Sequence, residues 1–79
     1  MAEALYKTKQ WRYLHERANL SLKNAARMVG ISKKTLDDYF LIFRYGEIYG
    51  YNFKENLYKK MGHLRTYIKK QPEKIKGRL

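Results

Sequence analysis

With 79 residues, the chain is long enough for one small domain but too short to support an elaborate catalytic pocket. Its composition, 44% hydrophobic and 15% aromatic, is that of a folded domain rather than a disordered segment, and the absence of cysteine excludes disulfides and thiolate metal sites. Eighteen Lys and Arg against seven Asp and Glu give a net charge of +11. Such an excess favours a polyanionic partner, and nucleic acid is the commonest, ahead of a membrane surface or an acidic protein.

The sequence offers no pattern for catalysis, metal binding or membrane insertion. It contains no glycine-rich phosphate loop, no nucleophile elbow and no paired catalytic carboxylates, and His15 and His63 lack ligand partners at metal-binding spacing. No apolar run approaches the roughly 18 residues that cross a bilayer, and no signal-peptide pattern opens the chain. We therefore expect a soluble, intracellular protein that is not an enzyme and has no cofactor, no small-molecule substrate and no membrane partner. Binding to DNA would place it in the nucleus.

The first predicted helix covers about residues 3–18, because its apolar residues recur on one helical stripe and most of its charges lie off it. Trp11 lies on that stripe, and we expect it in the core rather than on a binding surface. Asn19 tolerates the left-handed backbone that ends helices. Ser21 is a suitable N-cap for a short second helix, and Gly30 is a suitable end for it.

The third predicted helix runs from about Lys33 to Tyr45, with Ser32 as its N-cap and Gly46 as its end. Its expected buried side consists of Leu36, Tyr39, Phe40 and Phe43.

Residues 47–51 form an aromatic connector, in which we expect packing against the third helix rather than stacking on nucleic-acid bases by Tyr45, Tyr49 and Tyr51. A fourth continuous helix should follow Asn52 and end near Lys70, since one apolar stripe comprises Phe53, Leu57, Met61, Leu64 and Ile68. Gly62 falls off this stripe and weakens the helix by roughly 1 kcal/mol. Residues 71–79 are predicted to be a basic flexible tail.

The strongest local pattern lies between Leu22 and Tyr39, where each restricted position of a helix-turn-helix has a suitable residue. Ala26 is small where two helices touch, and Gly30 adopts a positive φ at no steric cost. Ile31 is apolar where the turn enters the core, and Leu36 seals the second helix against the first. A helical hairpin of the same shape that binds protein is the alternative interpretation.

These positions occur in the stretch SLKNAARMVGISKKTLDDYF, residues 21–40, which resembles the helix-turn-helix of homeodomain-like proteins. The resemblance implies an all-α fold of three helices with the helix-turn-helix at residues 21–46, to which the fourth amphipathic helix is added. The expected domain covers residues 1–70.

A second resemblance is carried by KKTLDDYFLIFRYGEIYGYNF and by MGHLR further on. These runs are similar to homeobox-like proteins of ciliates, among which is an accessory subunit of a DNA adenine methyltransferase complex. The resemblance implies a non-catalytic role, either engaging DNA or acting as a scaffold beside a separate methyltransferase.

In homeodomain-like proteins the third helix enters the major groove of duplex DNA. The resemblance implies that base edges or phosphates are met by Ser32, Lys33, Lys34, Asp37, Asp38 and Leu41. Thr35 either caps the helix or touches a phosphate, and the flanking backbone is held by Lys23, Arg27 and Arg44. For each basic residue the alternative is a solvated surface side chain.

Asp37 and Asp38 depart from what a DNA-reading surface requires. A carboxylate accepts a hydrogen bond from cytosine N4, but two of them beside phosphates are repulsive. Two alternatives to a DNA contact are open. The carboxylates stabilise the N-terminal half of their own helix, or they bind a basic partner protein.

Basic residues concentrate in the last third of the chain, where residues 54–79 hold nine basic and two acidic residues, a charge of +7. This second DNA-binding element comprises Lys59, Lys60, Arg65, Lys69, Lys70, Lys74, Lys76 and Arg78. Contact with about six phosphates would give a log–log salt slope of roughly −5. A solvated helix face, or packing of the apolar stripe on another protein, is the alternative.

The leading hypothesis is therefore a module that binds double-stranded DNA. A docking subunit that uses the same fold within a larger nuclear complex, a methyltransferase or another assembly, is the second hypothesis. RNA binding is the weaker third, because the usual aromatic sheet platform is missing.

Overall fold

A computed structural model describes residues 1–71, which form five helices and no strand. The helices are α1 (Ala2–Arg17), α2 (Leu22–Val29), α3 (Lys33–Ile48), α4 (Phe53–Asn56) and α5 (Met61–Lys69). The predicted all-α class is confirmed for this part of the chain. The predicted tail, apart from Gln71, lies outside the described residues.

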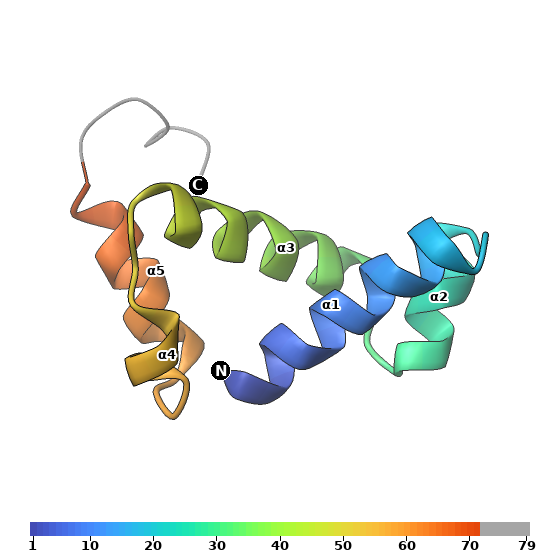
Figure 1. Cartoon of the computed structure of the whole chain (residues 1–79), viewed down its shortest axis with the longest axis horizontal. Helices are drawn as coiled ribbons and strands as arrows, with labels where there is room; N and C mark the ends of the chain where they lie inside the picture. The colour runs from blue at the N-terminus through green and yellow to red at the C-terminus, as the bar shows by residue number, and fades with distance from the viewer. Residues whose placement is uncertain (72–79) are drawn as a thin grey trace.

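The molecule is elongated, with extents of 36 × 26 × 19 Å. α3 runs along its length, with α2 toward one end and α4 and α5 at the other (Figure 1). α1 contacts both α2 and α3, while α5 contacts α3. The apolar interior is correspondingly divided into two clusters along α3.

The first cluster, here named the turn cluster, lies between α1, α2 and the start of α3. It consists of Trp11, Ala25, Ala26, Val29 and Leu36. Trp11 is fully buried, as expected, and its indole Nε1–H donates to the carbonyl of Leu22 at 2.9 Å. The indole therefore fills the core without leaving its polar atom unsatisfied.

The connections around α2 have the local features that the sequence predicts. Asn19 adopts a φ of +58° after α1, and Gly30 adopts +85° after α2. The Ser21 hydroxyl accepts the backbone N–H of Asn24 at 3.0 Å, and the Ser32 hydroxyl accepts that of Thr35 at 3.2 Å. Each side chain satisfies an N–H that a helix start leaves without a partner, which is why both helices begin where they do.

The second cluster, here named the C-terminal cluster, joins the later half of α3 to α5 and to the connector. It consists of Ile42, Phe43, Tyr51, Leu64 and Ile68. The rings of Phe53 and Tyr67 both meet the Tyr51 ring edge-on, with centroids 5.0 Å away. Tyr45 and Tyr49 pack half-buried against the same cluster. The expectation that the connector tyrosines pack within the domain is confirmed.

The Tyr51 hydroxyl lies 2.6 Å from Nδ1 of His63, an exposed residue of α5, in a partly buried contact. Burial raises the pKa of the Tyr51 hydroxyl above its ordinary value of 10.0, and the charge of a deprotonated Tyr58 adds a smaller increase. Lys59 Nζ lies 3.3 Å from Nε2 of the same histidine. His63 therefore links the connector to the segment before α5.

The prediction that Gly46 ends the third helix is wrong. α3 continues to Ile48, and Gly46 is buried within it. A Cβ at Gly46 would lie 2.7 Å from Phe53 Cζ and 2.9 Å from Leu64 Cδ1. The glycine is needed for the close approach of these side chains, whereas the turn after the helix uses Gly50 at φ +76°.

The prediction of one continuous fourth helix is also wrong, because residues 57–60 separate α4 from α5. Within a continuous helix the carbonyls of Leu57 and Lys59 would bond to amides four residues later. Here they accept from the backbone nitrogens of Ala2 at 3.1 Å and Met1 at 2.8 Å. Gly62 lies in the first turn of α5, with open space around it.

Candidate nucleic-acid interface

An open hollow of about 360 Å³ lies at the connection between α2 and α3. We name it the turn hollow; it is lined by Lys23, Ala26, Arg27, Gly30, Ile31, Ser32 and Lys33. α2 supplies Lys23 and Arg27 from successive turns, and Lys33 begins α3. Four residues predicted as DNA contacts therefore come together around one feature of the fold.

Three basic side chains at this end of the molecule carry uncompensated charge. Lys23, Arg27 and Lys34 are exposed, and none of them has a hydrogen-bond or ion-pair partner within residues 1–71. Lys33 differs, because its ammonium donates to Asp37 at 2.8 Å. Lys23, Arg27 and Lys34 can therefore bind a phosphate without breaking an existing contact.

Asp37 and Asp38, the acidic pair in the predicted reading surface, both have basic partners. Asp37 pairs with Lys33 one turn earlier, and Asp38 accepts from Arg65 of α5 at 2.6 Å. All four side chains are about half exposed, so these are surface pairs that contribute little to stability. The two ion pairs nevertheless reduce the negative charge with which Asp37 and Asp38 would repel a phosphate.

The other predicted contacts on α3 have different surroundings. The Ser32 hydroxyl donates to Thr35 Oγ1 at 2.9 Å while accepting the Thr35 N–H, so both hydroxyls serve the helix start. Leu41 is half-buried. Arg44 is exposed and lines a groove against α1 instead of the turn hollow.

The basic residues of the last third lie away from the turn hollow, at the end of the molecule formed by α4 and α5 (Figure 1). Lys59 is engaged with His63, and Arg65 with Asp38. Lys60, Lys69 and Lys70 are exposed without partners among the described residues. Lys74, Lys76 and Arg78 lie outside the described part of the chain. Among the described residues, the basic side chains of the two predicted elements therefore lie in two separate groups.

Two basic residues of α1 that were not predicted as binding residues lie at a groove of their own. Lys9 and Arg17 are exposed and without partners within residues 1–71, and both line the groove that also contains Arg44. Their separation by eight residues places them on one helix face. This spacing could have indicated a basic face on the first helix. It could not have shown that this face borders a groove against α3.

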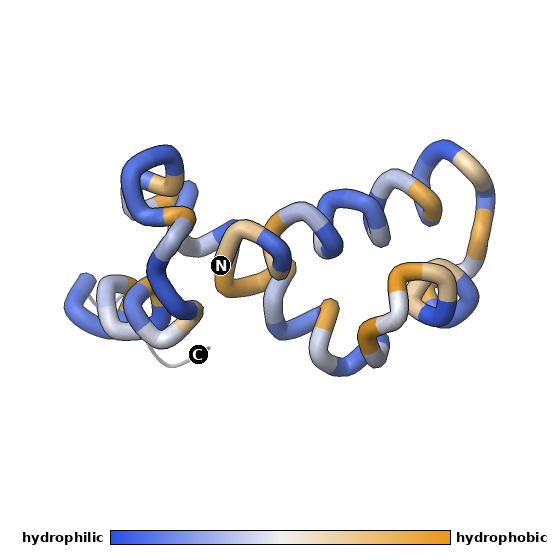
Figure 2. Tube along the Cα trace, turned by 90° about the horizontal axis from the view of Figure 1, so that it is seen from below, coloured by the Kyte–Doolittle hydropathy of each residue, from blue (hydrophilic) through white to orange (hydrophobic). Residues whose placement is uncertain are grey.

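Two further findings concern residues 1–71 alone. No three His, Asp or Glu side chains come together there in a way that could hold a metal ion. Hydrophobic residues recur in short groups along the trace (Figure 2), and none of the described helices is both long and apolar enough to span a bilayer.

Comparisons with protein-family models, with curated protein sequences and with solved structures find no match to this chain.

Proposed function

We propose that this chain is a non-catalytic, duplex-DNA-binding module of the homeodomain-like helix-turn-helix type. The observation that carries the proposal is a set of three exposed cations without partners among residues 1–71. Lys23 and Arg27 line the turn hollow, and Lys34 is the second residue of α3. The capped start of α3 lies at the same place, and backbone N–H groups at a helix start favour an anion.

Phosphate contacts supply most of the affinity in this proposal. Lys and Arg that neutralise phosphates release condensed counterions, which makes binding tight at low salt and weak at high salt. Base reading is limited, because Asp37 and Asp38 are engaged with Lys33 and Arg65. We therefore propose a protein that positions itself on a duplex with modest sequence preference.

The second basic group extends the contact along the duplex. The long axis of the molecule is 36 Å, which corresponds to about ten base pairs at 3.4 Å per step. Lys60, Lys69 and Lys70, at the end opposite α2, would then meet phosphates about one helical turn away from those held at the turn hollow.

The test is a fluorescence-anisotropy titration of the 79-residue chain with a duplex of about 20 base pairs, twice the length that the molecule spans. The double variant Lys23→Gln/Arg27→Gln should weaken binding about tenfold and reduce the log–log salt slope by about 2. Lys34→Gln should weaken it less and reduce the slope by about 1.

Lys54→Gln is the matched control, since Lys54 is exposed on α4, lacks a partner among residues 1–71, and lines neither the turn hollow nor the α1–α3 groove. It should leave affinity within about twofold. An equal loss in Lys54→Gln and Lys34→Gln would mean that net charge alone determines binding. No binding at low salt would contradict the proposed function.

The proposal includes a role in the nucleus beside a DNA adenine methyltransferase, which the resemblance to ciliate homeobox-like proteins supports. Its test is adenine methylation of a duplex by such an enzyme with and without this chain. The Lys23→Gln/Arg27→Gln variant should lower any stimulation in proportion to its loss of DNA affinity.

A further inference from the structure

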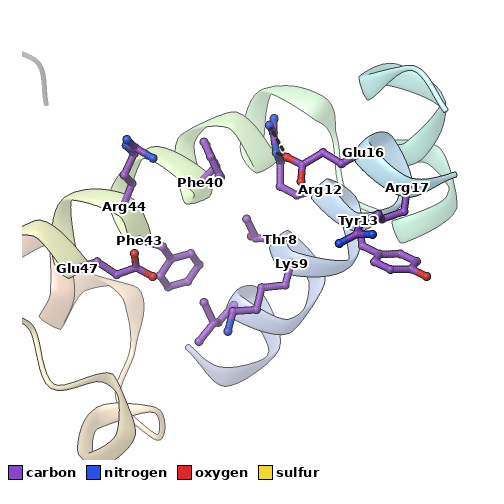
Figure 3. A pocket seen from close by; sticks show the side chains of 11 residues that line it. Thr8, Lys9, Arg12, Tyr13, Glu16, Arg17, Phe40, Phe43, Arg44 and Glu47 are labelled. Atoms are coloured by element: carbon purple, nitrogen blue, oxygen red, sulfur yellow. Dashed lines mark hydrogen bonds and ion pairs between the residues drawn. The ribbon is translucent and has the colours of Figure 1, made fainter. Parts of the chain in front are cut away.

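A groove lined by residues of α1 and α3 runs between these two helices and has a volume of about 370 Å³ (Figure 3). Its floor contains Leu5, Phe40 and Phe43, and its rim contains Lys9, Arg17 and Arg44. The volume lies near the lower end of the range of about 300–1,000 Å³ that is typical of binding sites. The groove is distinct from the turn hollow, with which it shares no lining residue.

The floor is apolar, and among residues 1–71 no buried side-chain polar atom lacks a hydrogen-bond partner. Phe43 is 5% exposed, and Thr8, at 3% exposed, donates its hydroxyl to the Ala4 carbonyl at 2.7 Å. The Arg12 guanidinium lies 4.6 Å from the Phe40 ring centroid and covers one part of the floor. An occupant gains by placing an apolar side chain here, because a polar one would lose its hydration without compensation.

The rim is positively charged after its internal pairs are counted. Arg12 and Glu16 neutralise each other at 2.9 Å. Lys9, Arg17 and Arg44 have no side-chain partner within residues 1–71. The same is true of the Glu47 carboxylate on α3, whereas the other carboxylate of the groove, Glu16, is paired with Arg12. Within the described residues the rim thus has three unpaired cations and one unpaired carboxylate, which makes it complementary to an acidic surface.

We propose that this groove binds an acidic amphipathic helix of another protein. One large apolar side chain of that helix enters between Leu5, Phe40 and Phe43, and its flanking carboxylates pair with Lys9, Arg17 and Arg44. This is the helix-in-groove mode of recognition, in which anchors at helical spacing enter an apolar groove. A nucleic-acid backbone would use the cations but leave the apolar floor unused.

The test uses the full chain and a defined probe, a fluorescein-labelled amidated peptide of sequence EDEFEALLDEAE, whose Phe and Leu residues lie on one helical stripe. Fluorescence anisotropy should give a dissociation constant on the order of 10–100 µM. Two control peptides, one with Ala for Phe and both Leu, the other with Lys for every acidic residue, should each bind at least about tenfold more weakly.

Protein variants locate the peptide. Lys9→Glu should weaken peptide binding about tenfold, whereas Lys54→Glu, which makes the same charge change on α4, should change it by less than about twofold. Circular dichroism of each variant checks that the helices remain, since both substitutions are at exposed positions.

Amide chemical shifts of the isotopically labelled chain give an independent readout. The peptide should shift residues of α1 and α3 along the groove, and duplex DNA should shift residues around the turn hollow. Absence of peptide binding, equal weakening by Lys9→Glu and Lys54→Glu, or shifts confined to the turn hollow would each overturn the proposal. Single-stranded DNA tests whether a nucleic-acid backbone occupies the groove instead. If it binds, if Lys9→Glu abolishes that binding, and if the peptide does not bind, the proposal is overturned as well. Each result leaves the test of duplex binding through Lys23, Arg27 and Lys34 unaffected.

Discussion

The two apolar clusters along α3 are built in different ways. The buried residues of the turn cluster are aliphatic apart from Trp11 and come from α1, α2 and the start of α3. The C-terminal cluster has two buried aromatic residues, Phe43 and Tyr51, and the partly buried rings of Phe53 and Tyr67 meet the Tyr51 ring edge-on. It also depends on hydrogen bonds between distant residues, such as that from the Tyr67 hydroxyl to the Tyr49 carbonyl at 2.7 Å.

The difference shows two routes to a buried core in a small chain. Beside the turn cluster, Gly30 satisfies a requirement of its own backbone, the positive φ that ends α2. At the C-terminal cluster the requirement involves several residues together, because position 46 must lack a side chain for Phe53 and Leu64 to pack against the backbone of α3. A local requirement tolerates changes elsewhere, whereas a mutual one does not.

The largest expected effect comes from removing one fully buried leucine in either cluster. Leu36→Ala and Leu64→Ala should each lower the free energy of unfolding by about 2–5 kcal/mol, since both side chains are fully buried. α3 contributes to both clusters, so each variant should unfold in one transition. Chemical denaturation followed by Trp11 fluorescence and by circular dichroism measures this. Two separate midpoints in Leu64→Ala would show that the clusters are independent.

A smaller effect is expected from adding one methyl group at two helical glycines. Gly46→Ala should destabilise the chain by about 1–3 kcal/mol, because its Cβ would meet Phe53 and Leu64 at under 3 Å. Gly62→Ala should stabilise it by about 0.5–1 kcal/mol, since nothing lies near and alanine favours the helix. Thermal unfolding of the two variants checks the sign, and a stable Gly46→Ala protein would contradict the packing described.

The Tyr51 hydroxyl gives the C-terminal cluster a pH dependence that the turn cluster lacks. Because its folded-state pKa is raised by burial, the folded chain holds this proton more tightly than the unfolded chain does. The resulting stability is present below pH about 10 and is lost as the pH rises through the folded pKa. Tyr51→Phe should flatten the loss of stability as the pH rises above about 10, measured by urea unfolding at several pH values. If the free energy of unfolding of Tyr51→Phe fell with pH as steeply as that of the unmodified chain, this prediction would be contradicted.

The smallest change in stability is expected at the two acidic residues of α3. Asp37→Asn and Asp38→Asn should each change the free energy of unfolding by less than about 1 kcal/mol, because both ion pairs are half exposed. The DNA affinity should rise a few-fold in each variant, since Lys33 or Arg65 is released. Anisotropy titrations measure this change, and a fall in affinity would indicate that the carboxylates contact the DNA.

Sequence reasoning predicted the turn end of the molecule better than the C-terminal end. Ser21, Gly30 and Ser32 each act through their own backbone or a neighbour three residues on, so their roles are legible in the sequence. Gly46 is different, because a glycine that ends a helix and one that permits a close contact look alike until Phe53 and Leu64 are placed.

The same limit applies to the break before α5 and to the candidate site. The apolar stripe from Phe53 to Ile68 is continuous in sequence, and the interruption depends on hydrogen bonds from the start of the chain. The basic residues were identifiable, but not which of them are engaged. That Asp38 pairs with Arg65, 27 positions away, follows only from the packing of α5 on α3.

Because α3 supplies Leu36 to one cluster and Phe43 to the other, its middle turns are held from both ends. Amide hydrogens exchange with solvent through local openings as well as through global unfolding, and those near chain ends and in short helices open most often. The amides of residues 39–43 should therefore be the slowest to exchange, and those of the four-residue α4 among the fastest. A ligand that tightens either end should slow exchange along the whole of α3, including turns that it never touches.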